Sequence, residues 1–304
     1  MRAASVRVVL TALAAAALAW PASAAAEDPP FVGWSSLLPA LSIPYDVDSP
    51  DDCIAGRTQC VDKVIREMSK RFDPLASSCD HNAIFALAYL RTTQEYRAAI
   101  ADPGFFADTP FVNHEDAVFA RYYFEAYDAW AAGDREDVPA AWRIAFDAAR
   151  AHQVSASGNL LLGINAHVQR DLPFVLYSIG LVAPGGSSRK PDHDRVNVIL
   201  NRVTDGLIAE IARRFDPTVD DSDLPGYWDD FLTFQLLPTW REKAWRNAEA
   251  LAEAATTEAR AAVAQQIESD AAATAQSIVA LTQYFPGTGG SAARDAYCAA
   301  HWAG

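Results

Sequence analysis

The strongest constraint on the fold is a helical spacing of apolar residues that begins at Val61 and continues almost to the end of the chain. Val61, Val64, Ile65 and Met68 stand at positions i, i+3, i+4 and i+7 of one helical face. Further helical patterns cover residues 81–100, about 113–132, 138–152, 156–170, 173–181, 193–214, 227–237 and 239–284, the last being Ala-rich and open to one break. Alternation with a period of two is absent, so no strand is expected. The sequence predicts an all-α fold, a single multi-helix domain of eight or nine helices.

The ends of the chain differ from this helical part. Residues 1–24 are expected to be a signal peptide, 25–58 an extended N-terminal arm rich in Pro, Ser and Asp, 59–285 the all-helical domain, and 286–304 a C-terminal tail. Pro and Gly are expected to end helices, for example at Gly133 and Pro238.

The signal peptide is predicted from three features in order. Arg2 and Arg7 precede a short apolar run, and an Ala-x-Ala ending follows, with cleavage expected after Ala24 or Ala26. The run is shorter than the roughly 20 apolar residues that a transmembrane helix needs, so no stable membrane insertion is expected. The protein is therefore predicted to be secreted and extracellular.

The net charge limits the partners. The chain carries −14, and removal of two arginines with residues 1–24 gives −16 for the mature part. A charge of this sign repels nucleic acid, so nucleic acid is not expected as a resting partner. The charge leaves the oligomeric state open, and it does not exclude a phosphate ester, since a bound metal can reverse the local field.

All four cysteines lie in the part expected to be exported, where disulfides form. Three pairings are possible. Our preferred pairing joins Cys53 to Cys60 through a small loop around Gly56, which leaves Cys79 and Cys298 to attach the tail to an early helix. A zinc–thiolate site is the alternative, although no C-x-x-C spacing supports it.

Three histidines share one local setting. His81, His114 and His193 each follow an Asx residue at an expected helix start, where the Asx is placed to cap the helix. The positive end of the helix dipole disfavours imidazolium there, and neutral imidazole is both a metal ligand and a general base. The alternative is that these residues only cap helices. Glu115 and Asp116 beside His114 fit either interpretation, as catalytic carboxylates or as first-turn acids.

His167 and Asp171 stand four residues apart near the end of an apolar helix, so they share one face. Two such side chains can bind one cation, or Asp171 can orient the imidazole of His167. Gly163 and Ala166 leave room for close packing nearby. His152 and His301 are expected to be structural or solvated.

An aromatic stretch between residues 227 and 245 supports a different function class. It is rich in Tyr, Trp and Phe, and we expect it either in the core or along a pocket for an apolar ligand.

Two resemblances follow from these motifs. The stretches CDHNAIFALAYLRTT, FVNHEDAVFARYYF and GINAHVQRDLP resemble a family of secreted actinobacterial proteins of unknown function, which implies an all-helical domain over most of residues 50–285. The pair His167 and Asp171 resembles the H-x-x-x-D motif of the zinc-dependent phospholipase C and single-strand nuclease superfamily. The N-terminal Trp ligand of that superfamily and its second such helix have no counterpart here, so one or two metal ions are the most that the resemblance implies.

The leading hypothesis is a secreted metal-dependent hydrolase. His81, His114, His167, Asp171 and His193 would bind zinc or a similar ion, and Glu115 or Asp116 would act as base on a metal-bound water. The alternative is a secreted, non-enzymatic binding protein for a small apolar or lipid-like molecule.

Overall fold

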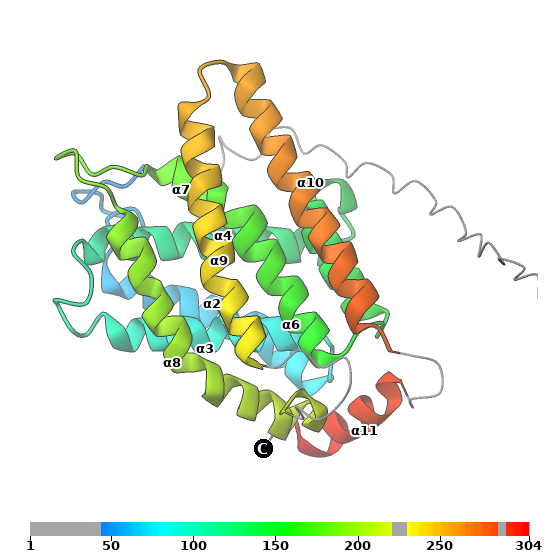
Figure 1. The fold of residues 1–304 in the computed structure, drawn as a ribbon. Coiled ribbons are helices and arrows are strands. Elements are labelled where there is room, and N and C mark those ends of the chain that lie inside the picture. The colour runs from blue at the N-terminus through cyan, green and yellow to red at the C-terminus, as the bar shows by residue number, and fades with distance from the viewer. Residues whose placement is uncertain (1–43, 221–229, 285–289, 304) are drawn as a thin grey trace, which may run out of the picture.

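A computed structural model describes residues 44–220, 230–284 and 290–303 (Figure 1). The expected signal peptide and most of the expected arm lie outside these ranges, and residues 44–57 form turns. The all-α prediction is confirmed: within the described ranges there is no β-strand, only two isolated bridges. The α-helices are α2 Thr58–Ser77, α3 Ala83–Ala99, α4 Thr109–Ala132, α5 Ala140–Arg150, α6 Ala156–Ile164, α7 Leu172–Ile179, α8 Lys190–Arg214, α9 Asp230–Glu253, α10 Thr257–Thr282 and α11 Ser291–His301.

Helix α3 is the centre of the fold. Its first eight residues, Ala83–Leu90, are all buried, and it packs against α2, α6 and α8. A helix that is apolar on all sides must be covered on all sides, which explains why the others surround it. At Gly163 of α6, a Cβ atom would lie 2.2 Å from the Phe85 ring, so the predicted close packing at this glycine is confirmed.

Helices α9 and α10 form a long antiparallel pair along one side of the molecule (Figure 1). The expected break at Pro238 is wrong, because Pro238 lies inside α9. The lost backbone hydrogen bond is offset by burial of Leu237, Trp245 and Ala248 in one apolar cluster with α7. The one break that the pattern over residues 239–284 left open lies before α10, where the Thr256 hydroxyl accepts the N–H of Ala259.

The helix starts at the three histidine motifs all differ from expectation. Helix α3 begins at Ala83 with Asn82 at its N-cap, so His81 precedes the helix, and the Asp80 carboxylate accepts the backbone N–H of Asn82. Helix α4 is capped by Asp108, which places His114 in its second turn. Asp192 lies inside the first turn of α8, and its carboxylate accepts two N–H groups of the loop before α4.

The preferred disulfide pairing is confirmed, with Cys53–Cys60 and Cys79–Cys298. The second bond holds α11 beside the start of α3, and the Arg214 guanidinium donates to the Trp302 carbonyl at 2.8 Å. The expected tail is therefore largely a docked helix.

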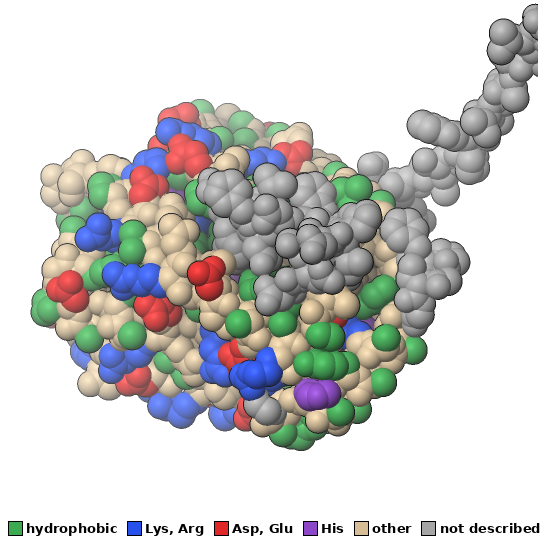
Figure 2. All heavy atoms as spheres, turned by 60° about the horizontal axis from the view of Figure 1, so that its bottom comes forward, with side chains coloured by type: hydrophobic (Ala, Val, Ile, Leu, Met, Phe, Trp, Pro, Cys, Tyr) green, Lys and Arg blue, Asp and Glu red, His purple; other side chains and the backbone are tan. Residues whose placement is uncertain are grey.

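On the face shown in Figure 2, acidic and basic side chains of the described residues are interspersed. The net negative charge thus forms no single patch there. No helix in the described ranges is long and apolar enough to span a bilayer.

Candidate active site

A cavity of about 130 Å³ lies between α3, α4, α6, α8 and α9. Its walls are mainly apolar and include Ala88, Phe119, Leu160, Ile199 and Leu207. An apolar cavity of about 150 Å³ in another protein holds benzene, so a ligand of roughly that size fits this one.

His167 lines this cavity and is held in one orientation. Its Nδ1 lies 3.0 Å from Oδ2 of Asp171, and its ring stacks on Phe119 with centroids 3.5 Å apart and planes at 6°. Burial lowers the pKa of His167, so the ring is neutral.

Asp171 determines which nitrogen of His167 carries the proton. Both residues are buried, and the carboxylate also accepts from Trp142 Nε1 at 2.8 Å and from Arg170 Nη1 at 2.9 Å. Because a carboxylate with these donors acts as an acceptor, we assign the proton to Nδ1 of His167. The Nε2 atom is then an acceptor, and it has no hydrogen-bond partner among the described residues. The sequence alternative in which Asp171 orients the imidazole matches this arrangement.

The turn that carries this pair is a π-helical segment, η2 (Asn165–Asp171). Pro173 follows it, and proline has no N–H to continue the normal helical bonding. The wide turn is also held by Asn165, which donates to the Ala271 carbonyl at 2.9 Å and accepts from Gln169 at 2.7 Å. Single π-turns occur often at functional sites.

Two carboxyl groups of α4 line the same cavity. Burial raises the pKa of Glu115 to about 7, and burial together with the neighbouring Glu115 raises that of Asp116 to about 7. Oδ2 of Asp116 has no hydrogen-bond partner among the described residues. A neutral carboxylic acid and a neutral imidazole base therefore share one apolar cavity at mildly acidic pH.

Arg241 of α9 adds a cation to the cavity wall. Its Nη2 donates to the His193 carbonyl at 2.6 Å, and His193 Nε2 donates to the Arg241 carbonyl at 3.2 Å. Burial lowers the pKa of Arg241 to about 10, and the charge of Glu115 opposes this shift. His193, whose pKa burial lowers well below its ordinary value, thus supports Arg241 and does not line the cavity.

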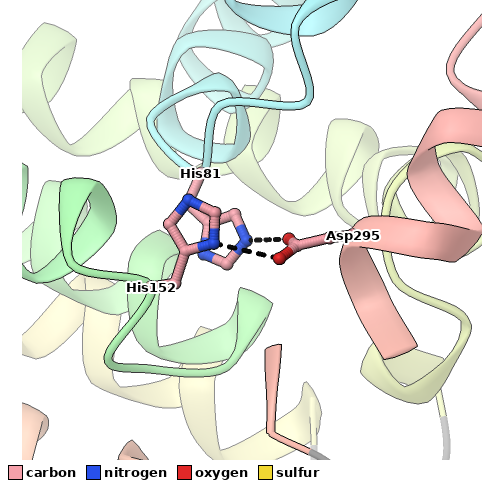
Figure 3. Close-up of side chains that lie close together, drawn as sticks. All are labelled: His81, His152 and Asp295. Carbon is pink, nitrogen blue, oxygen red and sulfur yellow. Dashed lines mark hydrogen bonds and ion pairs between the residues drawn. The ribbon is translucent and has the colours of Figure 1, made fainter. Parts of the chain in front are cut away.

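The predicted metal ligands are not gathered into one centre. Among the described residues, the one group of His, Cys, Asp or Glu whose ligand atoms lie within 4.8 Å of one another is His81, His152 and Asp295, which could hold a metal ion (Figure 3). His114 lies apart from it, with Nδ1 2.8 Å from the Cys53 carbonyl. Within the part of the chain described, the predicted ligands His167, Asp171 and His193 belong to no such group.

The side chains of the aromatic stretch are described only for residues 236–245. From residues 236–245, Leu237 and Arg241 line the cavity, whereas Trp245 packs in the core beside His193. The side chains of residues 227–235 lie outside the described part of the chain.

The pH dependence of stability follows from Glu115 and Asp116, the two partly buried acids of the cavity wall. The folded chain holds their protons above the pKa values of the unfolded chain, about 4, so their contribution to the free energy of unfolding is full below pH 4 and is lost as pH rises toward 7. His81, His167 and His193 have lowered pKa values in the folded chain. Because the unfolded chain binds their protons more tightly, these histidines lower the free energy of unfolding as pH falls below about 6.5. Substitution of each acid separates its contribution to the free energy of unfolding from that of the histidines. We expect Glu115→Gln and Asp116→Asn each to be about 2 kcal/mol more stable relative to wild type at pH 8 than at pH 5, from about 1.4 kcal/mol per pKa unit.

This difference is measured by urea unfolding of each variant at both pH values. The control is Glu253→Gln, since Glu253 is exposed at the end of α9. A pH profile of the Glu115 and Asp116 variants that matches this control would contradict raised pKa values in the cavity.

Comparison with known proteins places the chain in a family. The family of unknown function DUF5995 matches residues 61–281, a range that contains every residue lining the cavity but not Asp295. No curated protein and no solved structure matches the chain. Since the match covers more than half of the 304 residues, the chain belongs to the family of unknown function DUF5995.

Proposed function

We propose that the protein is a secreted hydrolase that acts by general acid–base catalysis on a small, uncharged and largely apolar substrate. The observation that carries the proposal is His167, a residue of the cavity wall whose Nδ1 is held by Asp171 and whose buried Nε2 has no hydrogen-bond partner among the described residues. Secretion is supported by the two disulfides and by the expected signal peptide.

The residues divide the chemistry between them. His167 Nε2 takes a proton from water as the water oxygen attacks a carbonyl carbon of the substrate, and the Asp116 carboxyl group gives its proton to the leaving oxygen. Hydrolysis of an ester is balanced in this way, and the two groups return to their starting forms when a proton passes from the imidazolium to the carboxylate. Arg241 stands in the same wall and can stabilise developing negative charge.

This chemistry needs no metal ion at the cavity. A metal-dependent hydrolase would require several ligand atoms close together in the cavity. Among the described residues, the group that meets this distance requirement is His81, His152 and Asp295, and none of these three residues lines the cavity. We therefore assign the zinc ion to His81, His152 and Asp295 and not to the cavity.

A second candidate is a secreted binding protein for a small apolar ligand. The apolar walls of the cavity favour it, with the polar groups serving to orient one polar atom of the ligand. A small molecule remains the proposed partner under both functions.

One experiment separates the two. Purified protein is tested against uncharged esters of short acyl chains, and benzene serves as an inert cavity ligand whose binding is followed by NMR. Saturable hydrolysis that benzene inhibits competitively supports the hydrolase. Benzene binding without hydrolysis of any ester overturns the hydrolase in favour of the binding protein, and absence of both overturns the assignment of the cavity as a site.

A further inference from the structure

His81, His152 and Asp295 meet although they come from three distant segments, and none of them lines the cavity (Figure 3). His81 precedes α3, His152 follows α5, and Asp295 lies in α11. Nε2 of His81 is 2.8 Å from Oδ1 of Asp295, and Nδ1 of His152 is 3.0 Å from Oδ2. The two imidazoles are stacked with centroids 4.0 Å apart, so both present a nitrogen to the same carboxylate.

The surroundings hold this group in place. The Cys79–Cys298 disulfide joins the two segments that carry His81 and Asp295. Cys79 and His152 both have left-handed backbone conformations, with φ of 55° and 51°, which non-glycine residues adopt at a cost. The positions of the ligands are therefore set by the fold before any ion binds.

The group is open to solvent on one side. His81 is buried, but the side chains of His152 and Asp295 are 42% and 34% exposed. Both line a surface hollow of about 360 Å³ that also contacts Ser78, Cys79 and Trp302. An ion held by three protein ligands would have room there for one or more water molecules.

One neighbour opposes a cation and must be accounted for. Arg294 Nη1 donates to Nδ1 of His81 at 3.2 Å, and its charge helps burial to lower the pKa of His81 to about 3. An ion on Nε2 would move the ring proton to Nδ1 and end this contact. Arg294 would keep its shorter bond to Asn159 Oδ1, at 2.7 Å, and its position 3.9 Å from Asp216.

We propose that His81, His152 and Asp295 form a binding site for one zinc ion or a similar divalent transition metal. Two imidazole nitrogens and one carboxylate are a ligand set typical of zinc with an open position, whereas calcium and magnesium prefer oxygen ligands alone. The ion would link α11 to the segments beside α3 and α5. The site shares no residue with the cavity and is independent of the proposed hydrolase.

The test measures zinc binding to the full chain by competition with a chromophoric chelator. We expect one zinc ion per chain, and at least about tenfold weaker binding for His152→Asn and for Asp295→Asn, since loss of even an outer-shell partner costs about 10–100-fold. Asparagine is chosen at position 152 because it tolerates the left-handed backbone. The control is His301→Gln, because His301 is exposed on α11 outside the group.

Thermal melting with and without zinc shows whether each variant folds and whether the ion stabilises it. The proposal is overturned if wild type has no saturable site of one ion per chain. It is also overturned if His152→Asn, with its fold intact, binds zinc as tightly as the His301→Gln control.

Discussion

Replacing His167 by asparagine is expected to lower ester hydrolysis by a factor of about 10²–10⁴, the usual contribution of a general base. The amide nitrogen of asparagine can take the place of Nδ1 and donate to Asp171, which now lies 3.0 Å from Nδ1 of His167. Nothing takes the place of Nε2. The variant thus removes the base from the cavity while it keeps the buried hydrogen bond, and the rate constant of hydrolysis is the quantity to measure.

Two further measurements define this prediction. Benzene binding to His167→Asn should be retained, because the apolar walls are unchanged, and His301→Gln should hydrolyse esters like wild type. If His167→Asn does not fold, His167→Gln replaces it, since its longer amide places a non-basic nitrogen near the Nε2 position. Full activity in a folded His167 variant would show that His167 is not the base.

Replacing Asp171 by asparagine is expected to lower the free energy of unfolding by about 3–5 kcal/mol, the cost of breaking a buried ion pair on one side. Asp171 is fully buried and accepts hydrogen bonds from Trp142, Arg170 and His167. Arg170 would keep its ion pair with Glu268, whose Oε1 lies 2.7 Å from Arg170 Nε, but it would lose the carboxylate of Asp171 as its second anionic partner. Urea unfolding measures the difference.

The matched control for Asp171 is Asp73→Asn, because Asp73 is exposed on α2. A loss of stability equal to that of this control would contradict the buried network. At urea concentrations where Asp171→Asn remains folded, hydrolysis should also fall, since the imidazole is no longer held with its proton on Nδ1.

The pattern of apolar residues predicted most of the helices because burial of one face leaves a period in the sequence. The run Ala83–Leu90 is buried on all sides and was still recognisable as helical. The break at Pro238 was wrongly predicted because tertiary burial around Leu237 outweighs one lost hydrogen bond. Local rules cannot weigh packing against a partner that is distant in sequence.

The same limit applies to the site. His167 and Asp171 are four residues apart, so their pairing could be predicted from helix geometry. The grouping of Glu115 and Asp116 with His167 at one cavity depends on how α4 packs beside η2, which no local pattern records.

His152 and Asp295 were not expected as possible ligands, although one signal pointed to part of that group. His81 lies two residues after Cys79, and Asp295 lies three residues before Cys298. The preferred disulfide between these cysteines therefore brought Asp295 close to His81. His152 carried no such signal, because its approach depends on the turn after α5.

The central claim is that His167, in the cavity wall, is a neutral base whose Nε2 carries no proton, and the ¹⁵N NMR spectrum of its imidazole tests this most directly. The resonance is assigned by its loss in His167→Asn. We predict a proton on Nδ1 and an unprotonated Nε2 at pH 7, and a shift of the Nε2 resonance when benzene enters the cavity. A proton on Nε2, or an imidazolium at pH 7, would contradict this prediction.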